Sequence, residues 1–551
     1  MREKIIAFLK NLKKLIPAGT PVSVSVSEDE RFGHYSTNLA FTLTKLEGYG
    51  DPMEKAGQLA EELRRKCEGV ARAEACTPGF VNIWLKPEAL QSVVSEVLRR
   101  GAEFGAPRRD PAKEEKLLEG EKIQVEFVSA NPTGPLTLAN GRGGFLGDVL
   151  ANVLTFAGAG GVDKKKKGVE REYYVNDTGN QIRILGKSIL VAVGLIPSDE
   201  DFYQGEYVKK WARTHKALAK KYVQAPEKLG AAAARDFLKS IKQALVKKAR
   251  IRFDRFTSEK GIHIKKFPSA ALAVFKKKGV VYEKDGAVWL KTSAYGDDKD
   301  RVLITSDGEP TYFLADAGHY LETKKRGFTA KINILGPDHY GYKARIQAAA
   351  KLLGLKRSEV IITQALHLVR GGKEVRMSKR RGEFVTLEDM VDEVGIDAAR
   401  FFSVGVSPDT HIDFDLEFAK ERSMKNPVFY AQYAYVRARG ILEKLRAENL
   451  KLKTLNGKAL VPLSTPEDVR LILKFDQFSE FVENVAKNYQ VHQLTWYAMS
   501  LARAFHNFYE RERVIGEAPE IARARTALVN ATEIVLKNLF SLLGISAPDR
   551  M

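Results

Sequence analysis

Two strand–loop–helix units, far apart in the sequence, constrain the fold more than any other feature. The first is the apolar run IQVEFV at residues 123–128, followed by the turn-rich loop SANPTGP and a helical pattern that starts near Asn140. The second is an apolar run at 332–335, followed by a Gly-Pro-Asp-His loop, a helix over 344–353 and another strand. Right-handed crossovers connect such units, so they predict a parallel sheet with a ligand at the carboxyl ends of its strands.

Changes of pattern along the 551 residues predict three domains. We expect a small α+β domain over 1–108, a Rossmann-type α/β domain over 109–405 with a Lys/Ala-rich helical insertion near 195–265, and an all-helical bundle over 406–551. A chain of this length needs more than one core, because single cores stop growing at about 250–300 residues. The first 16 residues alternate lysines with apolar residues, which predicts an amphipathic helix rather than a secretory signal.

Charge and cysteine content narrow the class of protein. The formal net charge of +20 points either to a polyanionic partner or to general basicity, and charge alone favours neither. Two cysteines, Cys67 and Cys76, exclude a disulfide framework and a four-thiolate zinc site, and fit a reducing cytoplasm. No run of about 18 apolar residues suggests a membrane span.

The helix expected from about Asn140 offers a candidate anion site. Unpaired backbone N–H groups and the helix dipole attract phosphates at such an end. The glycines that follow, GRGGFLG, do not fit a dinucleotide fingerprint, because the third glycine of G-x-G-x-x-G would fall on Leu146. The prediction is therefore a phosphate contact without a dinucleotide motif.

A second candidate anion site is the loop GGKEVRMSKRRG, which glycines bound on both sides. Its cations are Lys373, Arg376, Lys379, Arg380 and Arg381. Several cations on a loop with glycine hinges suit a clamp on a polyphosphate, although a basic solvated turn would look the same in isolation.

Longer segments resemble a known family. VEFVSANPTGPLTLANGRGG resembles the first signature region of class I aminoacyl-tRNA synthetases in the arginyl form, and RMSKRRGEFVTLEDMVDEVGIDAARFF resembles the second. FGHYSTNLA and GFVNIWL are similar to that family's N-terminal domain, EYYVNDTGNQI and GPDHYGY to its catalytic core, and NPVFYAQYAYVRARGIL and GISAPDRM to its anticodon-binding bundle. The resemblance covers essentially the whole chain.

This resemblance implies a function for each domain. We expect an N-terminal tRNA-binding domain, a class I Rossmann-type catalytic domain and a C-terminal helical anticodon-binding domain. The implied reaction is the ATP-dependent ligation of L-arginine to tRNA(Arg) through an arginyl-adenylate, with Mg²⁺ accompanying ATP as substrate and no metal bound by the protein itself. The implied setting is a cytoplasmic monomer with no membrane contact.

The resemblance also implies an arginine pocket. A guanidinium is planar, permanently charged and rich in donors, so its pocket should present carboxylates and neutral acceptors at fixed positions. The matching residues are Glu126, Asn131, Tyr312 and Asp316. Glu126 lies in an apolar strand, where an ionised carboxylate is costly unless it meets a cation.

Further matching residues are expected to act on ATP. Those assigned to catalysis are Lys379, Arg376, Ser378, Thr137 and Asn140, with Lys379 as the main phosphate contact. Those assigned to ATP binding are Ala139, Gly141, Asp338, His339 and Met377. The enzyme's own chemistry would be positioning and charge stabilisation, because the arginine carboxylate itself attacks the α-phosphate.

The first signature departs from the family pattern. Where the family has His-x-Gly-His, this chain has Thr137, Leu138, Ala139 and Asn140, so both imidazoles are absent. Smaller departures are Tyr340 in place of a second histidine and the order His319-Tyr320, which reverses the usual Tyr-His. Two alternatives therefore stay open: a catalytically impaired or inactive tRNA-binding paralogue or variant, and a synthetase for another amino acid, which Glu126 and Asp316 disfavour.

Contacts to tRNA are expected at both ends of the chain. By resemblance, Phe80 and Asn82 would reach the D-loop, and Tyr430, Tyr433 and Arg437 would lie near the anticodon. Aromatic rings stack on unpaired bases and arginines bind phosphates, so this combination fits RNA, although an aromatic helix face is more often core.

Overall fold

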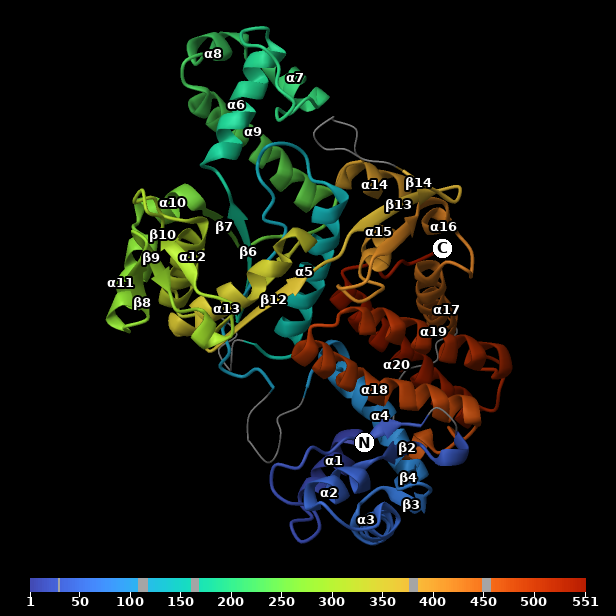
Figure 1. Cartoon of the computed structure of the whole chain (residues 1–551). Coiled ribbons are helices and arrows are strands. Elements are labelled where there is room, and N and C mark those ends of the chain that lie inside the picture. Colours follow the sequence, from blue (N-terminus) through green and yellow to red (C-terminus); the bar gives the residue numbers. More distant parts are fainter. Residues whose placement is uncertain (28–29, 108–116, 160–167, 376–384, 448–456) are drawn as a thin grey trace.

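The computed structural model describes residues 1–551 except 28–29, 108–116, 160–167, 376–384 and 448–456. Figure 1 shows the N-terminal domain at one end, the α/β domain in the middle and the helical bundle beside both. A helical arm projects from the α/β domain on the side away from the N-terminal domain.

The N-terminal domain is an antiparallel sheet, in the order β1-β2-β4-β3, covered by helices. Its elements are α1 Arg2–Lys10, β1 Ser25–Val26, β2 Tyr35–Thr37, α2 Leu39–Glu47, α3 Pro52–Lys66, β3 Val70–Cys76, β4 Phe80–Leu85 and α4 Pro87–Arg100. The amphipathic helix expected over the first 16 residues is shorter, because α1 ends at Lys10. Ile16 beyond it is nonetheless buried in the core.

The central sheet confirms the fold predicted from the strand–loop–helix units. It has five parallel strands in the order β12-β11-β5-β6-β7. The strands and the helices that follow two of them are β5 Ile123–Glu126, α5 Leu138–Phe156, β6 Val169–Val175, β7 Arg255–Ser258, β11 Ala330–Leu335, α13 Lys343–Leu352 and β12 Arg357–Ile362. The order reverses on the two sides of β5, which creates a crevice at the carboxyl ends of β5 and β11.

The helical insertion differs from its expected range near 195–265 at both ends. It comprises α6 Asn180–Ala192, α7 Glu206–Thr214, α8 Lys216–Lys221 and α9 Pro226–Lys247, with a hydrophobic core of its own. Residues 255–258 belong instead to the central sheet as β7. Periodicity alone did not separate this short strand from the helices before it.

Two glycines fix how the arm is packed. A Cβ built on Gly186 of α6 would lie 1.8 Å from the Pro226 carbonyl oxygen, and one on Gly230 of α9 would lie 1.9 Å from that of Ile182. The backbones of α6 and α9 therefore approach so closely that only glycine fits at both positions.

A second unit separates β7 from β11 and was not expected from the sequence. It contains α10 Glu259–Ile264, α11 Phe267–Lys277, β8 Val281–Lys284, β9 Ala287–Leu290, β10 Arg301–Ile304 and α12 Tyr312–Lys325. The strands form an antiparallel sheet in the order β10-β9-β8. The unit brings α10 and α12 to the edge of the crevice.

The C-terminal part begins with a small sheet rather than directly with helices. β13 Leu366–Arg370 pairs with β14 Lys373–Glu374 and with β15 Ile412–Asp415, beside α14 Leu387–Val394, α15 Ile396–Ser403 and α16 Leu416–Lys420. The bundle follows as α17 Pro427–Ala447, α18 Pro466–Asn488, α19 His492–Arg511 and α20 Pro519–Leu543. The all-helical pattern expected beyond about residue 405 therefore begins only after β15.

Helix α20 is long and apolar enough to cross a membrane by length and composition. However, 72% of its most apolar window is buried, and it packs against α4, α5, α17 and α19. A helix that is apolar on most sides and surrounded by others is the core helix of a bundle.

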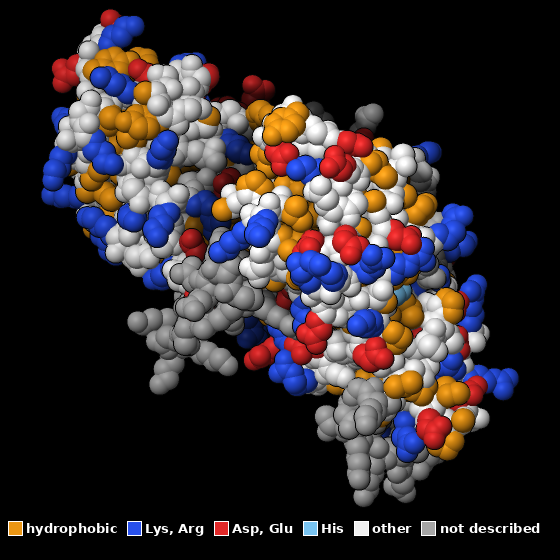
Figure 2. Space-filling model, turned by 90° about the horizontal axis from the view of Figure 1, so that it is seen from below, with side chains coloured by type: hydrophobic (Ala, Val, Ile, Leu, Met, Phe, Trp, Pro, Cys, Tyr) orange, Lys and Arg blue, Asp and Glu red, His pale blue; other side chains and the backbone are white. Residues whose placement is uncertain are grey.

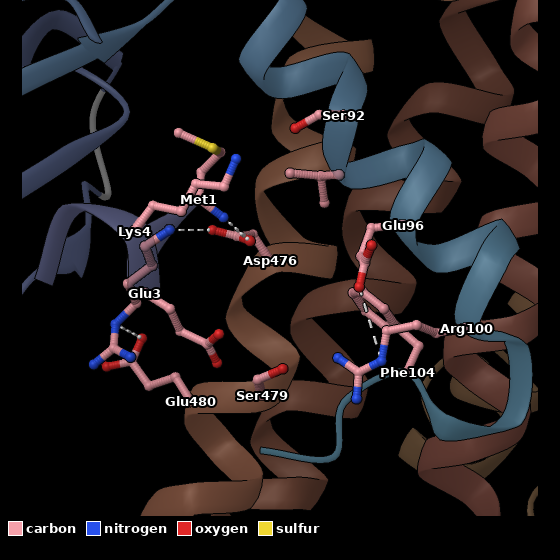
Figure 3. A pocket seen from close by; sticks show the side chains of 12 residues that line it. Met1, Glu3, Lys4, Ser92, Glu96, Arg100, Phe104, Asp476, Ser479 and Glu480 are labelled. Carbon is pink, nitrogen blue, oxygen red and sulfur yellow. Dashed lines mark hydrogen bonds and ion pairs between the residues drawn. The ribbon is translucent and has the colours of Figure 1, made fainter. Parts of the chain in front are cut away.

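The N-terminal domain and the bundle meet at a small cavity of about 140 Å³ where α1 and α4 face α18 (Figure 3). There Asp476 accepts hydrogen bonds from the amine of Met1 at 2.6 Å and from the backbone N–H of Arg2 at 2.9 Å. The hydroxyl of Tyr35, from β2, donates to the same carboxylate. This contact ties the first and last domains together.

Candidate active site

A cavity of about 460 Å³ opens at the carboxyl ends of β5, β6 and β11, between the start of α6 and helices α10 and α12. This is the edge of the sheet at which the repeated units predict a ligand. All four residues expected to bind arginine, Glu126, Asn131, Tyr312 and Asp316, line this cavity, and so does His339. The structure thus brings together residues that lie far apart in the sequence.

Two acids in the cavity wall have shifted pKa values. Burial raises the pKa of Asp316 to about 6, although the hydroxyl of Tyr342 donates a hydrogen bond to its carboxylate. Burial, the charge of Asp316 and that of Asp177 raise the pKa of Glu259 to about 7. Within the described part of the chain, neither Asp316 nor Glu259 forms an ion pair. The cavity therefore presents two acids whose ionisation a bound cation would favour.

Neutral groups complete the wall. The side-chain amide of Asn176 donates to Asn131 Oδ1 at 2.8 Å, which fixes the orientation of Asn131. Tyr312, at the rim, is 77% exposed. The ring of Tyr174 stacks on that of His319 with 4.4 Å between centroids. An aromatic and amide lining around two acids suits a long polar cation such as an arginine side chain.

Glu126 lies at the floor of the cavity and already has a cation. Its Oε2 accepts from Lys331 Nζ and from Asn333 Nδ2, both at 2.8 Å. Its Oε1 accepts from Ser129 Oγ at 3.4 Å. The sequence required that a carboxylate in this apolar strand meet a cation, and the structure provides one in Lys331 of the neighbouring strand β11.

The floor also contains a grouping that resembles a metal site. Ligand atoms of Glu126, Glu172 and His319 all lie within 4.8 Å of one another. However, Lys331 Nζ contacts all three residues, at 2.8 Å from Glu126 and 3.2 Å from both Glu172 and His319. An ammonium group fills the position, so these side chains do not fit a divalent ion.

The first turn of α5 uses Thr137 and Asn140 as a capping box. Thr137 is the N-cap, so the helix begins at Leu138, slightly before the expected start. The backbone N–H and the hydroxyl of Thr137 donate to Asn140 Oδ1 at 3.0 and 2.9 Å, and the Asn140 N–H approaches Thr137 Oγ1 at 3.5 Å. Both side chains, expected to contact phosphate, therefore bond mainly to each other.

The neighbouring residues expected to bind ATP have different surroundings. Ala139 is exposed, whereas Gly141 is buried against α14, where an added Cβ would lie 2.6 Å from Leu387 Cδ1. The Leu387 N–H donates to the Leu136 carbonyl at 3.0 Å. The two signature regions thus meet at the start of α5, and Gly141 permits that close contact.

Asp338 and His339 lie on the short turn after β11, with exposed side chains 3.4 Å apart. His339 lines the cavity, whereas Asp338 does not. The residues expected in the basic loop, Arg376, Met377, Ser378 and Lys379, lie outside the described residues. That loop joins β14 to α14, whose N-terminus lies next to the start of α5.

The residues expected to contact the D-loop differ in exposure. Phe80 is 39% exposed and packs edge-on against Phe41. Asn82 follows on the same face of β4 two residues later but is only 6% exposed, so its side chain offers little surface to an RNA. The face of the molecule shown in Figure 2 has many Lys and Arg side chains, with Asp and Glu side chains among them on its larger part.

The residues expected near the anticodon form one cluster on the bundle. The guanidinium of Arg437 lies between the rings of Tyr433 and Tyr509, at 4.4 and 4.5 Å from their centroids. Tyr430 packs edge-on against His506 at 4.6 Å. The sequence did not identify His506 and Tyr509 on α19, although their spacing of three residues places them on one helix face.

Two residues beneath the cavity, Glu172 and Lys331, were also missed. Lys331 lies in the apolar strand AKINIL, so the argument that singled out Glu126 could have found it, whereas Glu172 follows two charged residues in VEREYYV and carries no such signal. Nothing comparable marks Glu259, which follows Ser258, the N-cap of α10, and reads as an ordinary first-turn acid. Its position in the wall follows only from the unit between β7 and β11.

Comparison with known families matches nearly the whole chain. Residues 1–85 match the family described as the arginyl tRNA synthetase N terminal domain. Residues 109–402 match the catalytic domain of class I (R) tRNA synthetases, and residues 431–551 match the DALR anticodon binding domain.

Individual relatives agree. The chain is 37% identical over 544 residues to the arginine–tRNA ligase of Syntrophotalea carbinolica, covering 96% of this chain and 95% of that protein. It is 37% identical over 575 residues to that of Citrifermentans bemidjiense, covering 100% of both. Its fold is similar to that of Thermus thermophilus arginyl-tRNA synthetase, with a TM-score of 0.76, 22% identity and coverage of 100% of this chain and 99% of that one.

Proposed function

The chain belongs to the arginyl-tRNA synthetase family, and on that premise we propose that the cavity at the carboxyl ends of β5, β6 and β11 is the arginine site of an arginine–tRNA ligase. The observation that carries this proposal is the convergence of Glu126, Asn131, Tyr312 and Asp316 on one cavity. Within it, the guanidinium lies against Asp316 and Glu259, the two acids without an ion-pair partner among the described residues.

The reaction follows from the class. The arginine carboxylate attacks the α-phosphate of ATP, which forms arginyl-adenylate and releases pyrophosphate. A terminal ribose hydroxyl of tRNA(Arg) then attacks the activated carbonyl, which forms arginyl-tRNA and releases AMP. The protein contributes mainly by fixing the reacting groups and by stabilising charge on the phosphates. Mg²⁺ enters with ATP as part of the substrate.

The phosphates of ATP are proposed to lie at the start of α5. Because Thr137 and Asn140 bond to each other through Oγ1 and Oδ1, the remaining donors of the first turn are the backbone N–H groups of Leu138 and Ala139 and the side-chain Nδ2 of Asn140. His339 and the basic loop that contains Arg376, Met377, Ser378 and Lys379 supply further contacts. In this arrangement, main-chain and amide N–H donors take the place of two imidazoles. We therefore expect adenylate formation to be slow but measurable.

For tRNA, we propose contacts at Phe80 in the N-terminal domain and at the cluster of Tyr430, Tyr433 and Arg437 on the bundle. The exposure of Phe80 and the stacking of Arg437 between Tyr433 and Tyr509 support these assignments. The net charge of +20 supports a polyanionic partner. We propose that the enzyme works as a cytoplasmic monomer.

A charging assay with purified protein, arginine, ATP and tRNA(Arg) tests the proposal. We expect arginine to be transferred to tRNA, and Asp316→Asn to raise the KM for arginine about tenfold or more, because it removes one charge partner of the guanidinium. The matched control is Asp285→Asn, in the exposed turn between β8 and β9, which should leave KM unchanged. Retained tRNA binding without any charging would instead favour the inactive paralogue.

A further inference from the structure

Lys331 is the central residue of a buried polar cluster beneath the proposed arginine site. It is 0% exposed and comes from β11, which pairs with β5, which in turn pairs with β6. Its Nζ lies 2.7 Å from Gln124 Oε1, 2.8 Å from Glu126 Oε2 and 3.2 Å from Glu172 Oε2. Three adjacent strands therefore direct polar side chains to one point inside the sheet.

Charge explains why an ammonium group is stable there. Burial lowers the pKa of Lys331, but ion pairs with Glu126 and Glu172 more than offset it, so that its pKa is raised overall. Burial raises the pKa of Glu172, but Lys331 and His319 outweigh this effect and hold it well below the usual range. Lys331 is thus a buried ammonium group that two carboxylates, those of Glu126 and Glu172, share.

The two carboxylates depend on Lys331 to different degrees. Glu172 also accepts from His319 Nε2 at 3.0 Å and from the hydroxyl of Thr257, and it lies 3.8 Å from Arg255 Nε and 3.9 Å from Arg326 Nη1. Without Lys331, Glu172 would keep these partners.

Without Lys331, Glu126 would keep fewer and weaker partners than Glu172. Its other partners are the neutral donors Asn333 and Ser129, and His319 Nδ1 lies 3.8 Å away. Among the described residues, Lys331 is its nearest cation. If the lysine were lost, Glu126 would be the group to take up a proton, because it has fewer donors and an ionised Glu172 as neighbour.

We propose that Lys331 is a positioning residue for arginine: it is the cation that pairs with the Glu126 carboxylate through Oε2, which leaves Oε1 for the ligand. Glu126 and Ser129 line the cavity, whereas Lys331 does not, so the lysine acts on the ligand through Glu126. This inference rests on the proposed function, because it assigns the cavity to arginine. Glu126 is then available to arginine as the third acid of the pocket. The cation that pairs with Glu126 lies beneath the cavity and not inside it.

The test measures arginine and ATP binding by calorimetry in the wild type and in Lys331→Met, which keeps the length of the side chain without its charge. At pH 7 we expect the affinity for arginine to fall about tenfold or more, because a neutral Glu126 no longer attracts a guanidinium. The affinity for ATP should stay within about twofold, since Lys331 does not line the cavity and its contacts all lie beneath the arginine site. The double variant Lys331→Met/Glu172→Gln removes the neighbouring anion and should recover most of the arginine affinity.

A second readout separates charge from packing. In Lys331→Met, the raised pKa of Glu126 in the folded state should make the variant lose stability as pH rises, so that its deficit against the wild type is larger at about pH 8 than at about pH 5.5. A packing defect alone would lower the stability of the variant by the same amount at both pH values. Among the other charged or titratable groups nearby, His319 lies next to Glu126, Arg255 and Arg326 lie next to Glu172, and Asp316 and Glu259 line the same cavity as Glu126.

Each outcome decides the inference. Unchanged arginine affinity in Lys331→Met, or a stability deficit that is equal at both pH values, overturns it. If Lys331→Met does not fold, a double variant that folds supports the charge role, and one that also fails to fold overturns it. If the wild type binds no arginine, the proposed function is contradicted. If the wild type and Lys331→Met bind arginine equally tightly, only this inference is contradicted.

Discussion

At the scale of single residues, the proposed arginine site is defined by three acids, two of which have raised pKa values. Asp316 and Glu259 are half-buried in the cavity wall, with pKa values raised to about 6 and about 7, and no described residue neutralises them by an ion pair. Glu126, in contrast, has Lys331 as an internal cation. The pocket therefore selects for a ligand that carries its own charge, because a neutral side chain would leave two acids without a partner.

This arrangement predicts that arginine binding depends on pH. A bound guanidinium favours the ionised carboxylates, so arginine affinity should rise between about pH 6 and pH 8, with protons released on binding, and then level off. Without arginine, the raised pKa values mean that stability is lost as pH rises through about 6 to 7. Calorimetry in two buffers of different ionisation enthalpy measures the proton release. Glu259→Gln should remove the part of the dependence centred near pH 7, and an unchanged profile in that variant would refute the assignment.

At the scale of elements, helix α5 connects the sheet to the proposed phosphate site. Its capping box, made by Thr137 and Asn140, stabilises the helix start at the same two positions where the family pattern has histidines that contact ATP. Helix stability and phosphate binding therefore compete for these two positions. Gly141, next to them, lets α14 approach within contact distance of α5.

Restoring the family pattern should show this competition. We expect Thr137→His/Ala139→Gly/Asn140→His to raise the rate of adenylate formation by about tenfold or more, because single transition-state donors contribute about a hundredfold or more in typical enzymes. The same variant loses its N-cap and should lose about 1 kcal/mol of stability. Pyrophosphate exchange and chemical denaturation measure the two effects. Thr137→Ser, which keeps the cap and adds no imidazole, is the control, and an equal rate in both variants would contradict the prediction.

At the scale of the whole molecule, one buried arginine joins three parts of the chain. Arg400 of α15 is 0% exposed and donates to the carbonyl oxygens of Leu543 at 3.1 Å and Ala249 at 3.0 Å. It also pairs with Asp148 of α5. Ala249 follows the arm, Asp148 belongs to the central domain and Leu543 ends the bundle. Arg400 therefore fixes the anticodon-binding helices relative to the active site.

Removing this contact should loosen the assembly of domains. Arg400→Met leaves two buried carbonyls without this donor and Asp148 with Arg171 as its remaining arginine partner, so it should cost about 2–4 kcal/mol. Arg523→Met, on the exposed side of α20, is the control and should cost less than about 0.5 kcal/mol. Thermal and denaturant unfolding monitored by circular dichroism compare them. Equal transition midpoints for the two variants would contradict the role assigned to Arg400.

Much of the fold could be predicted from the sequence because it depends on local pattern. The strand–loop–helix units at 123–156 and 332–353 predicted the parallel sheet and the edge where a ligand lies, since strand direction and crossover handedness follow from local chirality. The same reasoning missed β7, β15 and the three-stranded sheet β10-β9-β8, because short strands between helices carry too few residues for a period of two to be recognised.

Four residues were expected to bind arginine because of a motif resemblance, and the structure places all four on one cavity, while their role stays a prediction. The charge partners of these residues could not be predicted from the sequence. Whether Glu126 is neutralised by Lys331, how Glu172 and His319 surround that lysine, and whether Glu259 reaches the same cavity depend on which strands are neighbours and on where α10 is placed. Electrostatic interactions act through space over a few ångströms, whereas sequence patterns report only neighbours along the chain. The sequence by itself therefore determined the family and the kind of ligand, and only the tertiary structure decided which charges meet and which are left for the substrate.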